Sequence, residues 1–218
     1  MPHSGSRRKD IPTFVKDQAL VEKRRRQIVE AAVELFVRQG FHQTTTREIA
    51  RAAGFSIGTL YEYIKSKEDV LYLVCDTIHT AMENQLRAAL GAHGAGREAL
   101  RAAMENYFKV CDAMQDHILL IYQELRALEP ESLKFVLANE ERITSIFEDI
   151  LQLGALDGSL FPGSEQLIRL TAHNIVVLGH MWTFRRWSLS RHFSLSDYTQ
   201  FQISFIINEL SKSSDRGN

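Results

Sequence analysis

Cysteine is scarce in this 218-residue sequence, which holds only Cys75 and Cys111. The two lie far apart, each within apolar helical sequence, which favours reduced, buried thiols over a disulfide or zinc framework. No apolar run approaches the ~20 residues that a membrane span needs. A secretion signal is also missing, because the first 20 residues carry Arg7, Arg8 and Lys9 without an apolar stretch or a cleavage site. We therefore expect a cytoplasmic protein with no membrane contact, cofactor or metal.

Net charge is small, at −1, but it is unevenly distributed along the chain. Residues 1–67 hold 13 Lys or Arg against 7 Asp or Glu, a balance of +6, whereas residues 68–218 hold 13 against 20, a balance of −7. A basic first third on an acidic body is typical of a nucleic-acid-binding head attached to a core that does not bind nucleic acid.

Strand-like alternation of apolar and polar residues is hard to find, whereas helical periodicity is present almost everywhere. We predict an all-α fold of nine helices. The expected ranges are about 22–39, 46–53, 57–63, 67–90, 100–114, 117–129, 131–153, 164–187 and 195–210. The domains expected from this pattern are a flexible basic tail at 1–20, a helix-turn-helix domain at 21–66 and a second helical domain at 67–212.

Two short helices between residues 46 and 63 have the caps and the turn of a helix-turn-helix. Thr45 and Glu48 form a capping box for the first helix, and Ser56 follows the turn at Gly54 as the cap of the second. Small outward residues on the second helix would let it enter the major groove of DNA deeply. The residues expected on its buried side are Ile57, Leu60 and Ile64. The residues expected to face outward or toward the flanks are Ser56, Gly58, Thr59, Tyr61, Glu62 and Tyr63.

The runs from Thr44 to Ala50, from Ala53 to Tyr63 and from Lys65 to Glu68 together resemble the DNA-binding domain of tetracycline-repressor-type (TetR-family) regulators. The resemblance covers residues 26–73 and is specific, because caps, turn and spacing agree. Ile64 replaces the phenylalanine most common at that position in the family, which is a conservative change. The resemblance implies a nine-helix TetR-like fold and a ligand-responsive regulator, expected to be a repressor. Such a protein binds palindromic double-stranded operator DNA as a homodimer.

The resemblance also implies which residues meet DNA. The residues that match phosphate-contacting positions are Thr45, Thr46, Arg47, Tyr63 and Lys67. The residues that match the base-facing surface are Ile57, Gly58, Thr59 and Tyr61, with the cap Ser56 beside them. The basic runs Lys23 to Arg26 and Arg7 to Lys9 are candidates for further phosphate or minor-groove contacts. Taken singly, these side chains would serve equally well as caps, packing residues or a solvated face.

The last expected helix is too apolar to be covered on one side only. Because the body of the protein can cover one side, we expect a second copy of the chain to cover the other. The last two helices of each copy would then form a four-helix bundle in a homodimer. The apolar residues of the last helix are Tyr198, Phe201, Ile203, Phe205, Ile206, Ile207 and Leu210.

The second domain carries a candidate lining for an effector pocket, which the resemblance places among its helices. The apolar candidates are Met104, Tyr107, Phe108, Met114, Tyr122, Phe147, Leu178, Met181 and Trp182. Arg185 and Arg186 stand between Trp182 and Trp187, and guanidinium groups beside aromatic rings suit phosphates and a purine. This segment is similar to family members that sense acyl-CoA thioesters, with Arg186 as the candidate ligand. A role for both arginines in capping the helix end is the alternative.

A sensor of neutral or cationic hydrophobic drugs that controls an efflux pump is the competing hypothesis for the effector. It would need at least one carboxylate turned into the pocket, and the candidates are Glu105, Asp112 and Glu124.

Two further patterns match enzyme or metal chemistry. Gly54 to Gly58 fits the G-x-S-x-G pattern of a hydrolase with Ser56 as nucleophile, but that elbow needs a strand where a helix is expected here. His173 and His180 are seven residues apart and share a helix face, yet no Cys or carboxylate completes a metal-ligand spacing. We expect no enzyme activity, and a core or pocket role in hydrogen bonding for the histidines.

Overall fold

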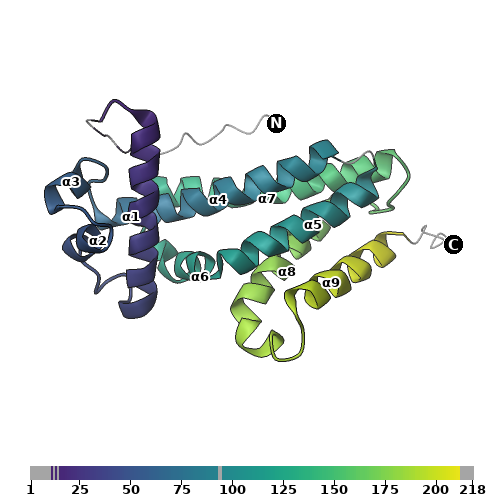
Figure 1. The fold of residues 1–218 in the computed structure, drawn as a ribbon. Helices are drawn as coiled ribbons and strands as arrows, with labels where there is room; N and C mark the ends of the chain where they lie inside the picture. The colour runs from purple at the N-terminus through teal and green to yellow at the C-terminus, as the bar shows by residue number, and fades with distance from the viewer. Residues whose placement is uncertain (1–10, 12, 14, 93–94, 212–218) are drawn as a thin grey trace. The chain divides into compact units, whose positions relative to one another are not determined.

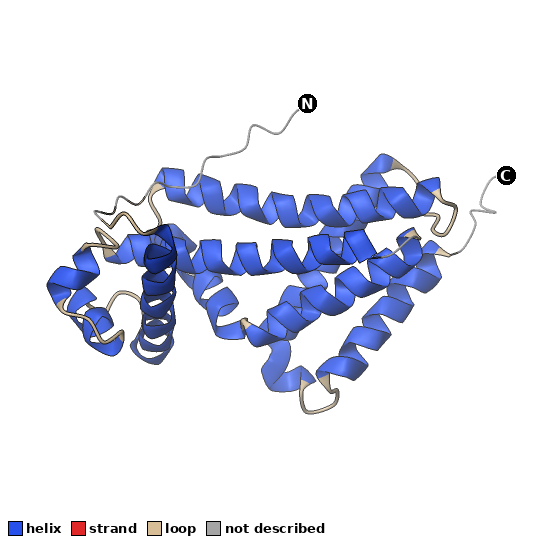
Figure 2. Cartoon of the chain, turned by 45° about the horizontal axis from the view of Figure 1, so that its top comes forward, coloured by secondary structure: helices blue, strands red, loops and turns tan. Residues whose placement is uncertain are grey.

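The computed structural model describes residues 11, 13, 15–92 and 95–211, and this part of the chain forms nine α-helices and one short 3-10 helix without any strand (Figures 1 and 2). The all-α prediction is therefore confirmed. The elements are α1 (Gln18–Gln39), α2 (Thr46–Ala52), α3 (Ile57–Tyr61), α4 (Lys67–Ala92), α5 (Gly96–Ala113), α6 (Gln115–Glu124), η1 (Leu125–Ala127), α7 (Pro130–Leu156), α8 (Glu165–Leu189) and α9 (Leu195–Leu210).

Side-chain caps set where helices begin. Thr45 and Glu48 form both halves of the predicted capping box at α2: the Thr45 hydroxyl accepts from the Glu48 amide, and the Glu48 carboxylate accepts from the Thr45 amide at 2.8 Å. The first helix begins four residues earlier than predicted, because Asp17 caps it by accepting from the Leu20 amide at 3.1 Å.

The third helix is shorter than predicted and ends at Tyr61. The amides of Glu62 and Tyr63 bond to carbonyls three residues back, those of Thr59 and Leu60. This tighter bonding pattern replaces the last α-helical turn that the sequence pattern indicated.

Helix α7 continues through Gly154, where a loop was predicted. Gly154 lies against Gly96 at the start of α5, and a Cβ on Gly96 would stand 2.2 Å from the Gly154 amide nitrogen. The glycine therefore serves a close helix-to-helix approach, and the helix tolerates it.

The described residues belong to two compact units. The head unit comprises residues 1–78 and 116–139, and the body unit comprises residues 79–115 and 140–218. Helices α4 and α7 each contribute to both units. The domain boundary after residue 66 remains a prediction.

The core of the head unit is built from the apolar side of α1 and the inner sides of α2, α3 and early α4. Leu60 is the buried residue of α3, and Ile64 just beyond it is also fully covered. Ile57, which was expected on the buried side, is 36% exposed, so that expectation is wrong. The other fully or nearly fully buried residues of the head unit include Ile28, Ala32, Phe36, Ile49 and Val70.

The core of the body unit is formed where α5 packs against α8 and α9 (Figure 1). Gly179 of α8 allows this approach, because a Cβ there would lie 2.4 Å from a ring carbon of Tyr107 and 2.9 Å from Cys111 Sγ. None of the helices in the described ranges combines the length and apolar character that crossing a membrane requires.

Candidate nucleic-acid interface and effector site

A tight turn joins α2 to α3 and orients the second helix. Gly54 in this turn has a φ of 76°, a left-handed conformation that glycine adopts without strain. Ser56 then caps α3, because its hydroxyl accepts from the Thr59 amide at 3.0 Å. With only five residues, α3 keeps its orientation through this cap and through its packing on the rest of the head unit.

The outer side of the α2–α3 pair is formed by the residues that the sequence marked for DNA contact. Ile57 and Tyr61 are 36% and 49% exposed. A Cβ on Gly58 would meet only Ser56 Oγ, at 3.7 Å, so this side of α3 is open. Among the predicted contact residues, the exposed ones are Thr45, Arg47, Ser56, Ile57, Gly58 and Tyr61, and the partly exposed ones are Thr46, Thr59 and Lys67.

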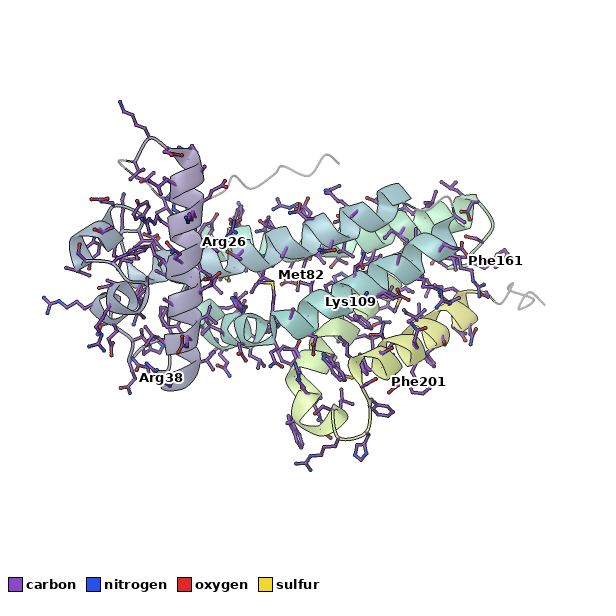
Figure 3. The ribbon with its side chains drawn as sticks, viewed as in Figure 1. Arg26, Arg38, Met82, Lys109, Phe161 and Phe201 are labelled. Atoms are coloured by element: carbon purple, nitrogen blue, oxygen red, sulfur yellow. The ribbon has the colours of Figure 1, made fainter. Side chains whose placement is uncertain are left out.

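Polar and cationic contacts support this outer side. The Tyr61 hydroxyl lies 3.1 Å from Thr46 Oγ1, which connects α3 to the start of α2. The Arg24 guanidinium lies over the Phe55 ring at 5.1 Å. Arg26 and Arg38 also project from α1, where both are exposed (Figure 3). The second basic run, Arg7 to Lys9, lies outside the described residues.

Tyr63 is a core residue, which corrects the expectation that it faces outward. Its side chain is only 4% exposed, and its ring lies 6.4 Å from that of Phe55. Its carbonyl accepts from Arg25 Nε at 3.3 Å, while Arg25 Nη2 donates to the Ile11 carbonyl at 2.5 Å. Arg25, like Arg24, therefore has partners within the protein, which periodicity did not indicate.

Lys67 also has an internal role. Its ammonium donates to the carbonyls of Phe41 and His42 at 2.7 and 3.2 Å and lies 4.4 Å from the centre of the Phe41 ring. His42 in turn approaches the Glu124 carboxylate of α6 at 3.5 Å. The loop between α1 and α2 is therefore held from two sides within the head unit.

Most of the predicted effector residues form a closed aromatic core in the body unit. Met104, Tyr107, Phe108 and Phe147 are each fully covered. The Tyr107 ring meets that of Phe147 edge-on at 5.5 Å, and it lies 6.0 Å from that of Phe108. Tyr122 belongs to the head unit and is 47% exposed, so the structure does not assign it to this core.

Trp182 and Arg186 are tied to one acidic side chain. Asp112 accepts from Trp182 Nε1 at 2.7 Å and from Arg186 at 2.8 Å, and Arg186 also donates to Gln115 at 2.8 Å. Arg185 is exposed, with its guanidinium 5.2 Å from the Trp187 ring. Of the two arginines considered for phosphate binding, Arg186 thus has internal partners.

The carbonyl of Leu178, another predicted effector residue, accepts from the Tyr198 hydroxyl at 2.6 Å. The Tyr198 ring in turn lies 5.1 Å from that of Trp182. Leu178 itself is partly exposed, so it lies at the edge of the aromatic core.

A small recess lies between α5 and α9, with a volume of about 260 Å³. Glu105 is on its wall and accepts from Gln200 at 3.3 Å. None of the predicted apolar effector residues lines it. Its lining residues are Glu105, Lys109, Leu195, Ser196, Thr199 and Gln200.

His180 does not pair with His173, because His173 is exposed while His180 is 4% exposed. Nε2 of His180 lies 3.1 Å from the Tyr107 hydroxyl instead. A second buried histidine, His79, lies 3.0 Å from the Glu140 carboxylate. Sequence reasoning missed this pair. The signal was a histidine within the apolar stripe of α4 that also holds Cys75, Ile78 and Met82.

The G-x-S-x-G pattern is a helix-helix turn. Ser56 follows α2, and its hydroxyl is engaged by the Thr59 amide and lies 2.9 Å from the Thr59 hydroxyl. No strand precedes it in the part of the chain that the structure describes. The same part contains no group of three or more His, Cys, Asp or Glu residues placed to hold a metal ion.

Helices α8 and α9 each leave large apolar side chains uncovered in the body unit, and these residues together are called here the α8–α9 stripe. Its residues on α8 recur every seven positions, at Leu170, Val177 and Phe184. Phe201 and Phe205 extend it onto α9 with exposures of 63% and 72%, and Phe201 is on the outer side of that helix in Figure 3. The opposite side of α9 is buried, as predicted.

Two family models match the chain. The model for bacterial regulatory proteins of the tetR family matches residues 28–72, and the model for the tetracyclin repressor-like C-terminal domain matches residues 93–185. The HTH-type transcriptional regulator HbdR of Aromatoleum sp. (strain CIB) is 30% identical over 190 residues, which cover 87% of this chain and 82% of that protein.

Solved structures share the fold. A tetR-family regulatory protein from Rhodococcus RHA1 has a TM-score of 0.76 and 25% identity, covering 88% of this chain and 99% of that one. AibR, solved in complex with isovaleryl coenzyme A and operator DNA, has a TM-score of 0.69 and 20% identity, covering 84% and 97%. With both family models, the related regulator and these folds in agreement, the chain belongs to the TetR family of bacterial transcriptional regulators.

Proposed function

We propose that this protein is a cytoplasmic repressor that binds palindromic operator DNA as a homodimer and is released by a small hydrophobic effector, an acyl-CoA thioester. Residues 21–66 form the DNA-binding domain in this proposal, and residues 67–212 bind the effector and form the dimer. The observation that carries it is the outer side of the α2–α3 pair, which is open while its inner side is buried.

The chemistry of that outer side suits the major groove. Gly58 leaves room for close approach, Ile57 offers an apolar contact to a thymine methyl group, and Tyr61 offers a hydroxyl to bases or phosphates. Arg47 at the start of α2 is exposed and supplies a phosphate contact.

The α8–α9 stripe supports the homodimer. Its seven-residue spacing on α8 and the exposed Phe201 and Phe205 on α9 are apolar surface of the kind that helix bundles bury. Two copies of this surface would pack against each other about a two-fold axis. A palindromic operator has the same two-fold symmetry.

The effector proposal rests on two observations. AibR, which shares the fold, was solved with isovaleryl coenzyme A. The body unit also contains an aromatic core, and Arg185 is exposed on α8 of the same unit, where its guanidinium suits the phosphates of coenzyme A. Since Arg186 is held by Asp112, we assign no phosphate contact to it.

Of the three carboxylates that the drug-sensing alternative could use, Glu105 does line the recess between α5 and α9, but that recess lacks the predicted apolar lining. Glu105 accepts from Gln200, Asp112 pairs with Arg186, and Glu124 lies beside His42.

The test is selection of bound sequences from a random duplex library with the full-length protein, followed by gel-shift assays with the selected site. We expect a palindromic site, one protein dimer or a pair of dimers per site, and release by acyl-CoA thioesters but not by cationic drugs. Failure to select any palindrome would overturn the DNA-binding proposal. Release by cationic drugs alone would overturn the effector.

A further inference from the structure

Four helices of the body unit bring together a polar cluster, called here the Glu140 cluster. It consists of His79 on α4, Tyr107 on α5, Glu140 on α7 and His180 on α8. His79 Nε2 lies 3.0 Å from Glu140 Oε1, and His180 Nε2 lies 3.1 Å from the Tyr107 hydroxyl. The Tyr107 hydroxyl also donates to the Val176 carbonyl at 3.2 Å.

Glu140 differs from its neighbours because it is not closed off. A third of its side chain is accessible, whereas that of His79 is 4% accessible. Burial acts to raise the pKa of Glu140, but the hydrogen bond with His79 and the charges of His79 and His180 outweigh it, and the pKa is lowered. Glu140 also adds to the effect of burial in raising the pKa of Cys111 on α5 to about 12. The carboxylate therefore stays ionised.

This arrangement leaves hydrogen-bonding capacity unused. An ionised carboxylate can accept about four hydrogen bonds. Within the described residues, His79 is the side chain that bonds to it. Nδ1 of His79 is buried with no partner in the same part of the chain. A polar ring nitrogen that is buried without a partner costs free energy, and groups of this kind occur often at binding sites.

We propose that the Glu140 cluster binds a hydroxyl group carried on an otherwise apolar effector. This inference rests on the proposed function, since it specifies the part of the effector that enters the body unit. The apolar portion would lie near the aromatic core that contains Phe108 and Phe147, both of which flank Tyr107.

A hydroxyl fits this cluster better than an ammonium group. It donates one hydrogen bond, to the carboxylate or to His79 Nδ1, which is an acceptor without a partner when Nε2 donates to Glu140. An ammonium group must lose a much stronger hydration shell to approach His79 Nδ1, and that nitrogen can accept from only one of its three N–H donors. Burial lowers the pKa of His180, whose Nε2 atom is engaged with the Tyr107 hydroxyl.

The test compares three probes with the same apolar body: 4-butylbenzyl alcohol, butylbenzene and 4-butylbenzylamine. Their affinities for the full-length protein are measured by calorimetry in the absence of DNA. We expect the alcohol to bind about tenfold or more tightly than butylbenzene, because it gains a hydrogen bond that butylbenzene cannot make. Glu140→Gln should reduce this preference severalfold, whereas Glu141→Gln, which alters an exposed neighbour, should leave it unchanged.

Equal binding of alcohol and hydrocarbon, tightest binding of the amine, or an unchanged preference in Glu140→Gln would each overturn the proposal. If Glu140→Gln does not fold, the His79 and His180 imidazole nitrogens of the wild-type protein are followed by NMR instead. Their resonances should shift with the alcohol and not with butylbenzene, and the absence of that difference would overturn the proposal.

A second comparison separates this proposal from the proposed function. Operator release is measured with octanoyl-CoA and 3-hydroxyoctanoyl-CoA. If neither thioester releases the operator, the acyl-CoA proposal fails, and the alcohol probe still decides the role of the Glu140 cluster. If both release it equally and the alcohol shows no preference, the acyl-CoA proposal stands and the Glu140 cluster is a structural feature only.

Discussion

The Tyr61 hydroxyl lies 3.1 Å from Thr46 Oγ1, so a single hydrogen bond joins the exposed side of α3 to the first residue of α2. Tyr61→Phe removes this bond and the hydroxyl available to DNA while keeping the ring. We expect operator affinity to fall severalfold with little change in the melting temperature, because Tyr61 is half exposed. Tyr122→Phe, at another half-exposed tyrosine, is the control. Equal affinity of wild type and Tyr61→Phe in gel-shift titrations would contradict the role of Tyr61.

Arg47 and Lys67 should behave differently, although both match phosphate-contacting positions. Arg47→Ala should weaken binding to all sequences and reduce the salt slope of log K by about 1, with unchanged stability. Lys67→Ala removes the donor to the Phe41 and His42 carbonyls, so we expect a lower melting temperature as well. Thermal melts and gel shifts at several salt concentrations measure both effects. A normal melting temperature for Lys67→Ala would show that its internal bonds contribute nothing.

Substitution by alanine should have opposite effects on stability at Gly58 and at Gly179. Gly58→Ala adds a methyl group to open space on α3, so the protein should fold normally and lose operator affinity. Gly179→Ala places a methyl group 2.4 Å from the Tyr107 ring and should destabilise the body unit by about 1–3 kcal/mol. Urea unfolding monitored by circular dichroism distinguishes them. A destabilised Gly58→Ala or a fully stable Gly179→Ala would disagree with this geometry.

The elements that sequence predicted well depend on neighbours a few residues away. The Thr45–Glu48 capping box and the Ser56 cap are local, and the structure contains both. The features that sequence missed join distant segments. Lys67 bonds to residues 26 and 25 positions away, and His79 bonds to Glu140, 61 positions away. Periodicity shows that such side chains lie on a helix face, but it carries no information about the partner on another helix.

The burial of Tyr63 has a similar explanation. From sequence, α3 was expected to continue to residue 63 with Tyr63 facing outward or toward the flanks, although residues three apart, such as Leu60 and Tyr63, lie near each other on a helix. The turn after Tyr61 changes the direction of the chain, and Tyr63 then enters the core beside Phe55.

The α8–α9 stripe predicts the effect of a charge on assembly. Phe205→Glu places a carboxylate in the proposed interface, and we expect sedimentation at micromolar concentration to show a monomer with reduced operator affinity. Leu156→Glu, at an 86% exposed position near the end of α7, serves as the matched control and should remain dimeric. A wild-type monomer, or a Phe205→Glu dimer, would refute the proposed interface.

Stability should decrease in mildly acidic solution because of His180. Burial lowers its pKa, so the unfolded chain takes up a proton that the folded chain resists as the pH falls below about 6.5. His180 thus contributes stability above that pH and loses it below, with a slope of at most about 1.4 kcal/mol per pH unit. His180→Gln should flatten the profile between pH 7 and 5, whereas His173→Gln, at an exposed position, should not. Identical slopes in urea unfolding for wild type and His180→Gln would rule this out.

Leu60 is the one residue that α3 contributes to the core. Substitutions in α3 that affect packing are therefore distinct from those that affect only its surface. Substitutions at the outward positions of α3 alter the surface without repacking any neighbour. The head unit can therefore acquire a new binding preference through one or two substitutions, while the body unit and its interior remain as they are. Under the proposed function, the DNA-sequence preference of the head unit and the effector preference of the body unit can therefore diverge independently.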